Sequence, residues 1–239
     1  MGGYSKKEGN DMKMTVFFGL NYGKIMKKER GGDMEEIQTV SIIGLGALGI
    51  LFGHHLSKKM EKEDLRIIAD SRRIERYEKN GIYCNGEQCN FHYVTPEEMV
   101  EPADLLIFTV KFNGLEEAIQ AVRHHVGPHT IILSALNGIS SEEMIGKTYG
   151  MDKLLFCVAQ GMDAVKIENR LTYDHMGMLC FGEKEPGIFS DQMKKVARFF
   201  DKVALPYEAD TNMMKRLWGK FMLNVGVNQT VAVYKSNYD

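Results

Sequence analysis

The sequence predicts an α/β fold built on a doubly wound, mostly parallel sheet. From residue 39 onward, short apolar runs of strand length alternate with segments of helical length, an alternation typical of parallel strands joined by helices. The first apolar run leads directly into Gly-Leu-Gly-Ala-Leu-Gly at residues 44–49. A Gly-x-Gly-x-x-Gly turn between a strand and a helix is the phosphate-binding loop of Rossmann-type folds. These observations predict a Rossmann-type domain with a dinucleotide site at this loop.

The three glycines of this loop have different mechanical roles. Gly44 permits the tight turn, Gly46 lets the backbone approach a pyrophosphate, and Gly49 lets the helix pack close to the strand. The helix that follows directs free N–H groups and a partial positive charge toward the phosphates. The loop residues expected to bind the cofactor are Gly44, Leu45, Gly46, Ala47, Leu48 and Gly49.

The remaining elements follow in order along the chain. Strands are expected where apolar residues form short runs, at 39–44, 65–70, 105–110, 130–136, 154–159 and 178–181. Helices are expected at 47–58, 72–79, 115–125, 190–203 and 210–233. Asn80-Gly81 should end the second helix, and a turn at Asn85-Gly86 indicates a hairpin within residues 82–94.

Two capping boxes predict further helix starts. Thr95 is followed by a proline and then by Glu98, a combination that favours a short helix. Ser140 with Glu143 has the same spacing.

Polar residues follow two of the other buried strands. Lys111 comes directly after strand 105–110, and Asn137-Gly138 comes directly after strand 130–136. Ligands of doubly wound sheets bind outside the carboxyl ends of the strands. We therefore expect these residues to share one crevice with the glycine-rich loop. Taken singly, Lys111 is better interpreted as a surface lysine at the end of a strand, and Asn137-Gly138 can be a plain turn.

Composition excludes several classes of function. The net charge is −2 over 239 residues, with both signs interspersed, so no electrostatic footprint for nucleic acid is present. No apolar run is long enough to span a bilayer, and no signal peptide is evident. The four scattered cysteines are expected to be reduced thiols of a cytoplasmic protein without a bound metal.

The chain divides into three expected parts. Residues 1–36 lack sustained periodicity and are expected to be a disordered leader outside the fold. Residues 37–208 form the Rossmann-type domain, and residues 209–239 begin an all-α second domain that is truncated. In this last part, Lys220, Asn224 and Asn228 are spaced by four residues on a mostly apolar helix, which places them on one narrow face. That face could also be simply solvated.

Together these motifs resemble the ketopantoate reductase (2-dehydropantoate 2-reductase) family. The matching segments are Gly44–Gly49, Val110-Lys111, Leu136-Asn137-Gly138 and Trp218-Gly-Lys220-Phe-Met-Leu-Asn224-Val-Gly-Val-Asn228. The resemblance implies NADPH-dependent reduction of 2-dehydropantoate, a small 2-oxo acid, to (R)-pantoate in pantothenate and coenzyme A biosynthesis. It also implies that Lys220 is the general acid. The implied substrate-binding residues are Lys111, Asn137, Asn224 and Asn228, of which Lys111 and Asn137 also line the nicotinamide.

The first departure from the family pattern concerns the cofactor. Asp70 stands at the end of the second strand, where the family usually has an arginine that meets the 2′-phosphate of NADP. An acid at this position favours the ribose 2′-hydroxyl of NAD, but Arg72 and Arg73 follow and could bind a phosphate. We expect NADP(H), with NAD(H) as the alternative, and all three residues as cofactor-binding.

The second departure is length, because no positions match further substrate-binding residues of the family's helical domain. Two alternatives to the reductase therefore stay open: a dinucleotide-binding fragment without turnover, and a related reductase of another 2-oxo acid. An apolar helix face without partners also favours a homodimer or self-association.

Overall fold

The computed structural model describes residues 36–234, apart from the side chains of Asn228 and Ala232. These residues belong to one compact unit, Glu35–Asp239. The expected leader therefore lies outside the described residues, except for its last residue.

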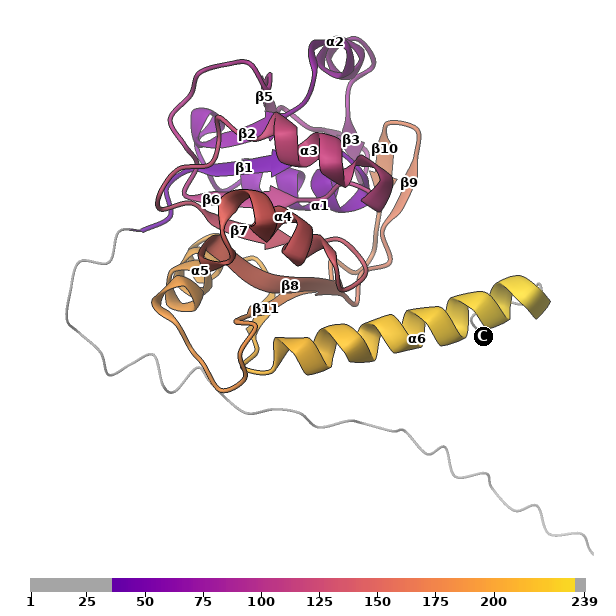
Figure 1. Cartoon of the computed structure of the whole chain (residues 1–239). Coiled ribbons are helices and arrows are strands. Elements are labelled where there is room, and N and C mark those ends of the chain that lie inside the picture. Colours follow the sequence, from indigo (N-terminus) through magenta and orange to yellow (C-terminus); the bar gives the residue numbers. More distant parts are fainter. Residues whose placement is uncertain (1–35, 235–239) are drawn as a thin grey trace, which may run out of the picture. The chain divides into compact units, whose positions relative to one another are not determined.

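The core of the unit is a large, mostly parallel sheet (Figure 1). Within the described residues it has eight strands in the order β12-β11-β8-β7-β6-β1-β2-β5. Its strands are β1 (Val40–Ile43), β2 (Leu65–Ile68), β5 (His92–Val94), β6 (Leu105–Phe108), β7 (Ile131–Ser134), β8 (Leu154–Gln160), β11 (Met178–Gly182) and β12 (Tyr207–Ala209). Neighbouring strands pair in parallel except β11 with β8. The predicted doubly wound sheet is confirmed.

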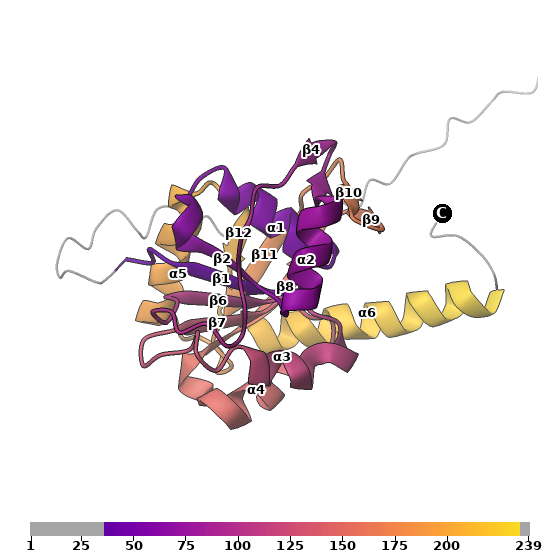
Figure 2. The ribbon, with the colours of Figure 1, turned by 90° about the horizontal axis from the view of Figure 1, so that it is seen from above.

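Helices cover both faces of this sheet (Figure 2). Side chains alternate along each strand: Val40 and Ile42 join the core beneath α1 (Ala47–Ser57) and α5 (Asp191–Lys202). Ile43 instead joins the core beneath α3 (Leu115–Ala121) and α4 (Ser141–Tyr149). Because both faces are buried, β1, β2, β6, β7, β8 and β11 are mostly apolar runs, and the sequence located these six strands to within two residues. It did not predict β12, and β5 was expected only as part of the region 82–94.

A second, smaller sheet lies beside the first. In the described part of the chain it has the order β4-β3-β10-β9. Its strands are β3 (Tyr83–Cys84), β4 (Glu87–Gln88), β9 (Val165–Ile167) and β10 (Arg170–Thr172). The predicted hairpin at 82–94 is confirmed as β3–β4. The β9–β10 hairpin was missed because each of its strands has only three residues and all of β9 is exposed.

Local signals at the ends of helices were partly right. The helix α2 (Ser71–Asn80) ends at Gly81, whose φ of 68° suits glycine, as predicted. The helix expected after Thr95 is wrong: the capping bond from Thr95 N to Glu98 Oε1 forms at 2.7 Å, but the chain makes only a turn. Pro102 soon follows and disfavours a helix just before it.

The other capping box and one helix length also differ from expectation. Ser140 precedes α4 but has helical dihedrals, so its hydroxyl accepts no capping bond. α3 ends at Ala121 and not at residue 125, because Val122 and His125 turn into the core in a non-helical segment. Single-turn 3₁₀ helices span Lys62–Asp64, Phe112–Gly114 and Met151–Lys153.

The last helix, α6 (Met213–Tyr234), starts against the sheet and then projects beyond it (Figure 1). Met213 and Leu217 are buried against β8 and β11. Arg216 fixes this first part through Nε to Asp210 Oδ2 at 2.5 Å and an ion pair with Glu208. The predicted helix is therefore confirmed, and the predicted domain boundary at residue 208 falls within β12.

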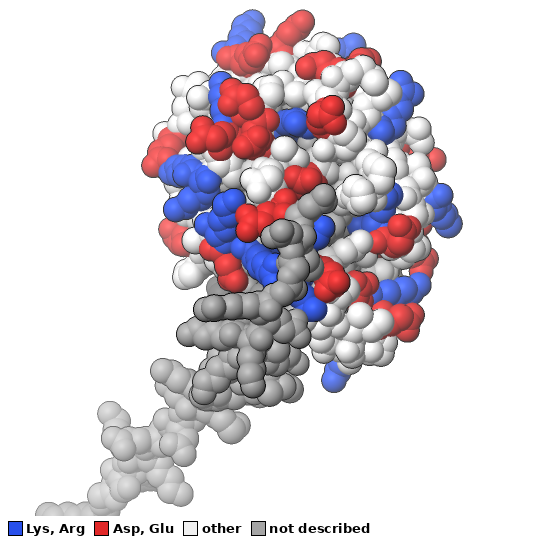
Figure 3. Space-filling model, turned by 90° about the vertical axis from the view of Figure 1, so that its left-hand side faces the viewer, with Lys and Arg blue, Asp and Glu red and all other residues white. Residues whose placement is uncertain are grey.

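The described surface carries both signs of charge. Lysine and arginine are mixed with aspartate and glutamate on the face shown in Figure 3. None of the helices between residues 36 and 234 has the length and apolar character that a membrane span requires.

Candidate cofactor and substrate site

The glycine-rich loop has the strand-turn-helix geometry that the sequence predicts. β1 ends at Ile43, and Gly44 turns the chain with a φ of 100°. A Cβ on Gly44 would lie 2.7 Å from Val110 Cγ1, and a Cβ on Gly49 would lie 1.9 Å from Gly44 O. Both glycines are therefore required by the protein's own packing.

A threonine that sequence reasoning missed fixes the loop to the neighbouring strand. Thr109 Oγ1 donates to Gly44 O at 2.6 Å and to Ile43 O at 3.1 Å. The only signal for it was a polar residue at the end of an otherwise apolar run. Thr109 thus couples the carboxyl end of β1 to that of β6.

Gly46 differs from the other two glycines. A Cβ there would meet only Thr109 O at 3.5 Å, an ordinary contact, and its φ of −75° is open to any residue. The fold itself gives no reason for glycine at this position. Gly46 is also the N-cap of α1 and supplies no side-chain cap, so the helix start is left for an external acceptor. The loop fits the pyrophosphate of a dinucleotide, which approaches glycine backbone and helix N–H groups in this way.

Asp70 and the two arginines after it lie at the carboxyl end of β2. Asp70 is the N-cap of α2: Oδ1 accepts from Arg73 N at 2.9 Å, and Oδ2 lies 3.2 Å from Arg73 Nε. Arg73 also lies 3.5 Å from Glu117. Arg72 is exposed and forms no ion pair with any described side chain. Arg72 is thus the less neutralised cation of the pair.

Lys111 and Asn137 occupy equivalent places on neighbouring strands. Phe108 of β6 pairs with Ser134 of β7, and each polar residue comes three positions later. Both side chains are exposed. The parallel register therefore brings Lys111 and Asn137 to the same edge as the glycine-rich loop, as predicted.

Lys220 reaches this edge from α6. Its Nζ donates to the main-chain oxygen of Ala159, near the carboxyl end of β8. The side chain is half-buried, and burial lowers the pKa of Lys220 below its ordinary value. An ammonium with a lowered pKa releases its proton more readily near neutral pH, which suits a general acid.

The remaining predicted substrate-binding residues follow Lys220 along α6. Asn224 is half-buried one turn further on. Asn228 lies in the same helix, but its side chain is outside the described residues.

Two cavities lie away from this edge. One, of about 320 Å³, is beside His54 and Glu87, and the other, of about 400 Å³, lies between α2 and β5. Neither is lined by the glycine-rich loop, Lys111, Asn137 or Lys220.

Known proteins match this chain over most of its described length. A 2-dehydropantoate 2-reductase from Streptococcus pyogenes is 26% identical over 198 residues, which cover 81% of this chain and 64% of the relative. One from Aquifex aeolicus is 24% identical, covering 82% and 63%. The chain thus spans less than two thirds of these relatives.

A solved structure shares the fold of this chain, and a family model matches its sequence. The crystal structure of 2-dehydropantoate 2-reductase from Geobacter metallireducens superposes with a TM-score of 0.70 at 21% identity, covering 82% of this chain and 66% of that one, and so shows the same fold. The family model described as ketopantoate reductase PanE/ApbA matches residues 40–184. That match includes the glycine-rich loop and extends from β1 to just beyond β11, and the chain therefore belongs to the ketopantoate reductase family.

Proposed function

We propose that this chain supplies the cofactor-binding part and the general acid of an NADPH-dependent reductase that converts 2-dehydropantoate to (R)-pantoate. The observation that carries the proposal is the position of Lys220. Its ammonium group is tied to Ala159 at the same edge of the sheet as the glycine-rich loop. Its pKa is lowered by burial, in keeping with proton donation.

Each residue of the site has a part in this reaction. A bound nicotinamide supplies the hydride that reduces the ketone carbon. Lys220 holds the proton that the carbonyl oxygen takes up as it becomes an alcohol. Asn224 and Asn228 bind the substrate's polar groups, while Lys111 and Asn137 line the place where nicotinamide and substrate meet.

The cofactor in this proposal is NADPH and not NADH. Asp70 uses its carboxylate to cap α2 and to pair with Arg73. A carboxylate engaged in this way competes less for a ribose hydroxyl, and Arg72 keeps its charge available for a 2′-phosphate.

A second candidate is dinucleotide binding without turnover. The exposure of Lys111 and Asn137 favours it, because exposed side chains at the site do not exclude water from the reaction. Two measurements separate the candidates: fluorescence titration of the chain with NADPH, and an NADPH-oxidation assay on 2-dehydropantoate with the chain supplied with the part of a full-length relative that it does not match. Oxidation that requires the substrate supports the reductase, binding without oxidation supports the second candidate, and no binding contradicts both.

A further inference from the structure

The strands β7 and β8 separate before they reach the edge that carries the candidate site. Their parallel register ends where Leu133 pairs with Leu155. β7 itself ends at Ser134, whereas β8 continues to Gln160. From Phe156 onward, β8 pairs only with β11 among the described strands. The main-chain groups on the side of β8 that faced β7 therefore need partners from outside the sheet.

Two helices, α4 and α6, supply these partners, and both lie beside β8 in Figure 1. Lys220 of α6 donates to the main-chain oxygen of Ala159. Two residues earlier in β8, the main-chain N–H of Cys157 donates to the carboxyl group of Glu142, in the first turn of α4. Alternate residues of a strand direct their main-chain groups to the same side, so Glu142 and Lys220 bind the same open side of β8. Ile139 also packs there, against the apolar cluster that β8 and β11 share with the first turns of α6.

A chain of hydrogen bonds ties Glu142 to the end of β7. Ser134 Oγ donates to Ser141 Oγ at 2.8 Å, and Ser141 Oγ donates to Glu142 Oε2 at 2.8 Å. All three side chains are buried, and Glu142 is only 1% exposed. Ser134 precedes the loop 135–140 and Ser141 follows it, so these bonds close the loop at its base. Asn137 lies in the middle of this loop.

The packing of this region does not by itself require a carboxyl group. Burial raises the pKa of Glu142, and its Oε1 lacks a hydrogen-bond partner among the described residues. Burying such a group costs free energy that an apolar side chain of similar volume would not cost. Hydrogen bonds, however, fix both distance and direction, whereas apolar contacts are non-directional. The carboxyl group therefore contributes a defined geometry between the end of β7 and β8.

We infer that Glu142 is a positioning residue for the reduction, which holds the loop of Asn137 at a fixed distance from Lys220. The inference rests on the proposed function, in which Asn137 lines the place where nicotinamide and substrate meet and Lys220 holds the proton. Glu142 reaches the loop through Ser141, and through Cys157 it reaches the stretch of β8 to which Lys220 is bound. A misplacement of about 1 Å between reacting groups can reduce turnover by about 10²-fold.

The test replaces Glu142 with leucine, which is of similar size but apolar, and with glutamine, which keeps an oxygen acceptor. Turnover of 2-dehydropantoate is measured with the chain supplied with the part of a full-length relative that it does not match. Glu142→Leu should lower kcat by about ten-fold or more, while NADPH affinity and the melting temperature do not fall. Glu142→Gln should restore most of the turnover. Glu143→Leu, at the exposed neighbouring position on α4, is the matched control and should leave kcat unchanged.

A loss of kcat that glutamine repairs, at an undiminished melting temperature, supports the inference. Three results overturn it and leave the proposed function standing: native turnover by folded Glu142→Leu, a loss that glutamine does not repair, and parallel losses of turnover and melting temperature. If Glu142→Leu does not fold, Ser141→Ala takes its place under the same criteria, because it removes the hydroxyl that donates to Glu142. If the unmodified protein does not oxidise NADPH with 2-dehydropantoate, the proposed reductase fails and this inference falls with it.

Discussion

The ammonium group of Lys220 donates a hydrogen bond to the main-chain oxygen of Ala159. This contact joins α6 to the carboxyl end of β8, and so places a half-buried cation at the edge of the sheet where the glycine-rich loop lies. The first turns of α6 are also held by Arg216 with Asp210 and Glu208. The position of Lys220 is therefore set by its own hydrogen bond to Ala159 and by the ion pairs of Arg216, one turn earlier in the helix.

Gly46→Val should abolish most cofactor binding without unfolding the protein. Its Cβ meets only an ordinary contact at 3.5 Å, but the side chain occupies the space that a pyrophosphate needs. We expect NADPH affinity to fall by at least about ten-fold in fluorescence titrations. Gly49→Val is the contrasting variant and should lose the fold as well, since its Cβ would lie 1.9 Å from Gly44 O. Unchanged affinity in Gly46→Val would place the cofactor elsewhere.

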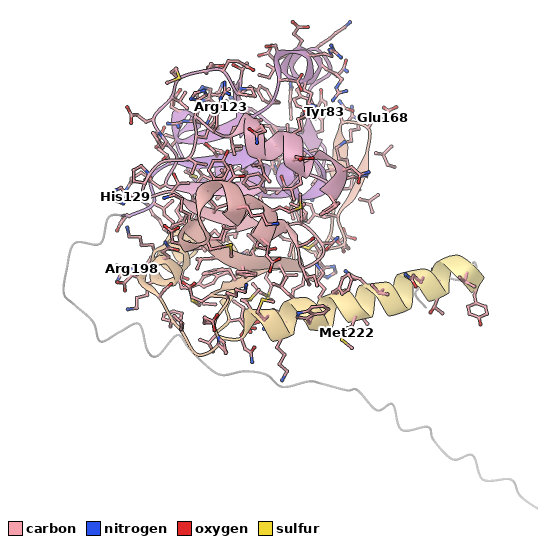
Figure 4. The ribbon with its side chains drawn as sticks, in the orientation of Figure 1. Tyr83, Arg123, His129, Glu168, Arg198 and Met222 are labelled. Atoms are coloured by element: carbon pink, nitrogen blue, oxygen red, sulfur yellow. The ribbon has the colours of Figure 1, made fainter. Side chains whose placement is uncertain are left out.

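Replacing Arg72 and Arg73 together with alanine should remove most of the preference for NADPH over NADH. The NADPH affinity should fall by about ten-fold or more because a phosphate loses its cationic partners, while NADH affinity should change little. Arg198→Ala serves as control, since Arg198 is an exposed arginine on α5 (Figure 4). An unmodified chain that prefers NADH would contradict this prediction at the outset.

Lys220→Ala should reduce turnover of 2-dehydropantoate by about 10²-fold or more, the usual scale for a lost general acid. The assay uses the chain supplied with the part of a full-length relative that it does not match. NADPH affinity should stay the same, because Lys220 acts on the substrate oxygen. Lys215→Ala, an exposed position on the same helix, should leave turnover unchanged. Parallel losses of turnover and thermal stability in Lys220→Ala would indicate a structural role.

Stability should fall as the pH is lowered from about 6.5 toward 4, through His125. This ring is fully buried, and both of its nitrogens lack a partner among the described residues. Burial lowers the pKa of His125 to about 4, so protonation near pH 5 favours the unfolded chain. The loss across this window is on the order of 3 kcal/mol. Urea unfolding of the native protein and of His125→Leu at pH 7 and 4.5 measures it; equal pH dependence of the two proteins would contradict the assignment.

The isolated 239-residue chain should self-associate through the outer face of α6. Trp218 is 46% exposed, and Met222, which points away from the sheet in Figure 4, is 68% exposed. Full burial of such side chains stabilises by roughly 1.5–3 kcal/mol each. Size-exclusion chromatography with light scattering should therefore show species larger than the monomer. Changing both residues to glutamine should reduce them, whereas Met99→Gln, at an exposed loop position, should not. A monomer at all concentrations would argue against this interface.

The sequence alone was sufficient to predict those parts of the structure that depend on contacts within or next to one short segment. The turn from β1 into α1 depends on Gly44 and Gly49. A Cβ atom at either position would clash with atoms of the same loop or of the segment that follows β6. The buried strands were found because both faces of a parallel sheet are covered, which makes each strand a continuous apolar run. Because neighbouring strands run in parallel, the residues that directly follow them, Lys111 and Asn137, could also be predicted to lie at one edge of the sheet.

The tertiary structure decided what depends on residues far apart in the chain. Asn169 donates a hydrogen bond to Asn80 across 89 residues, and this contact helps to place the β9–β10 hairpin, whose first strand is only three exposed residues long. The bond from Lys220 to Ala159, across 61 residues, was likewise invisible in the sequence. Periodicity reports which face of an element is buried, but it carries no information on which partner covers that face. Residue identity determined the glycine-rich turn, whereas the positions of Lys220 and of the β9–β10 hairpin depend on packing between distant segments.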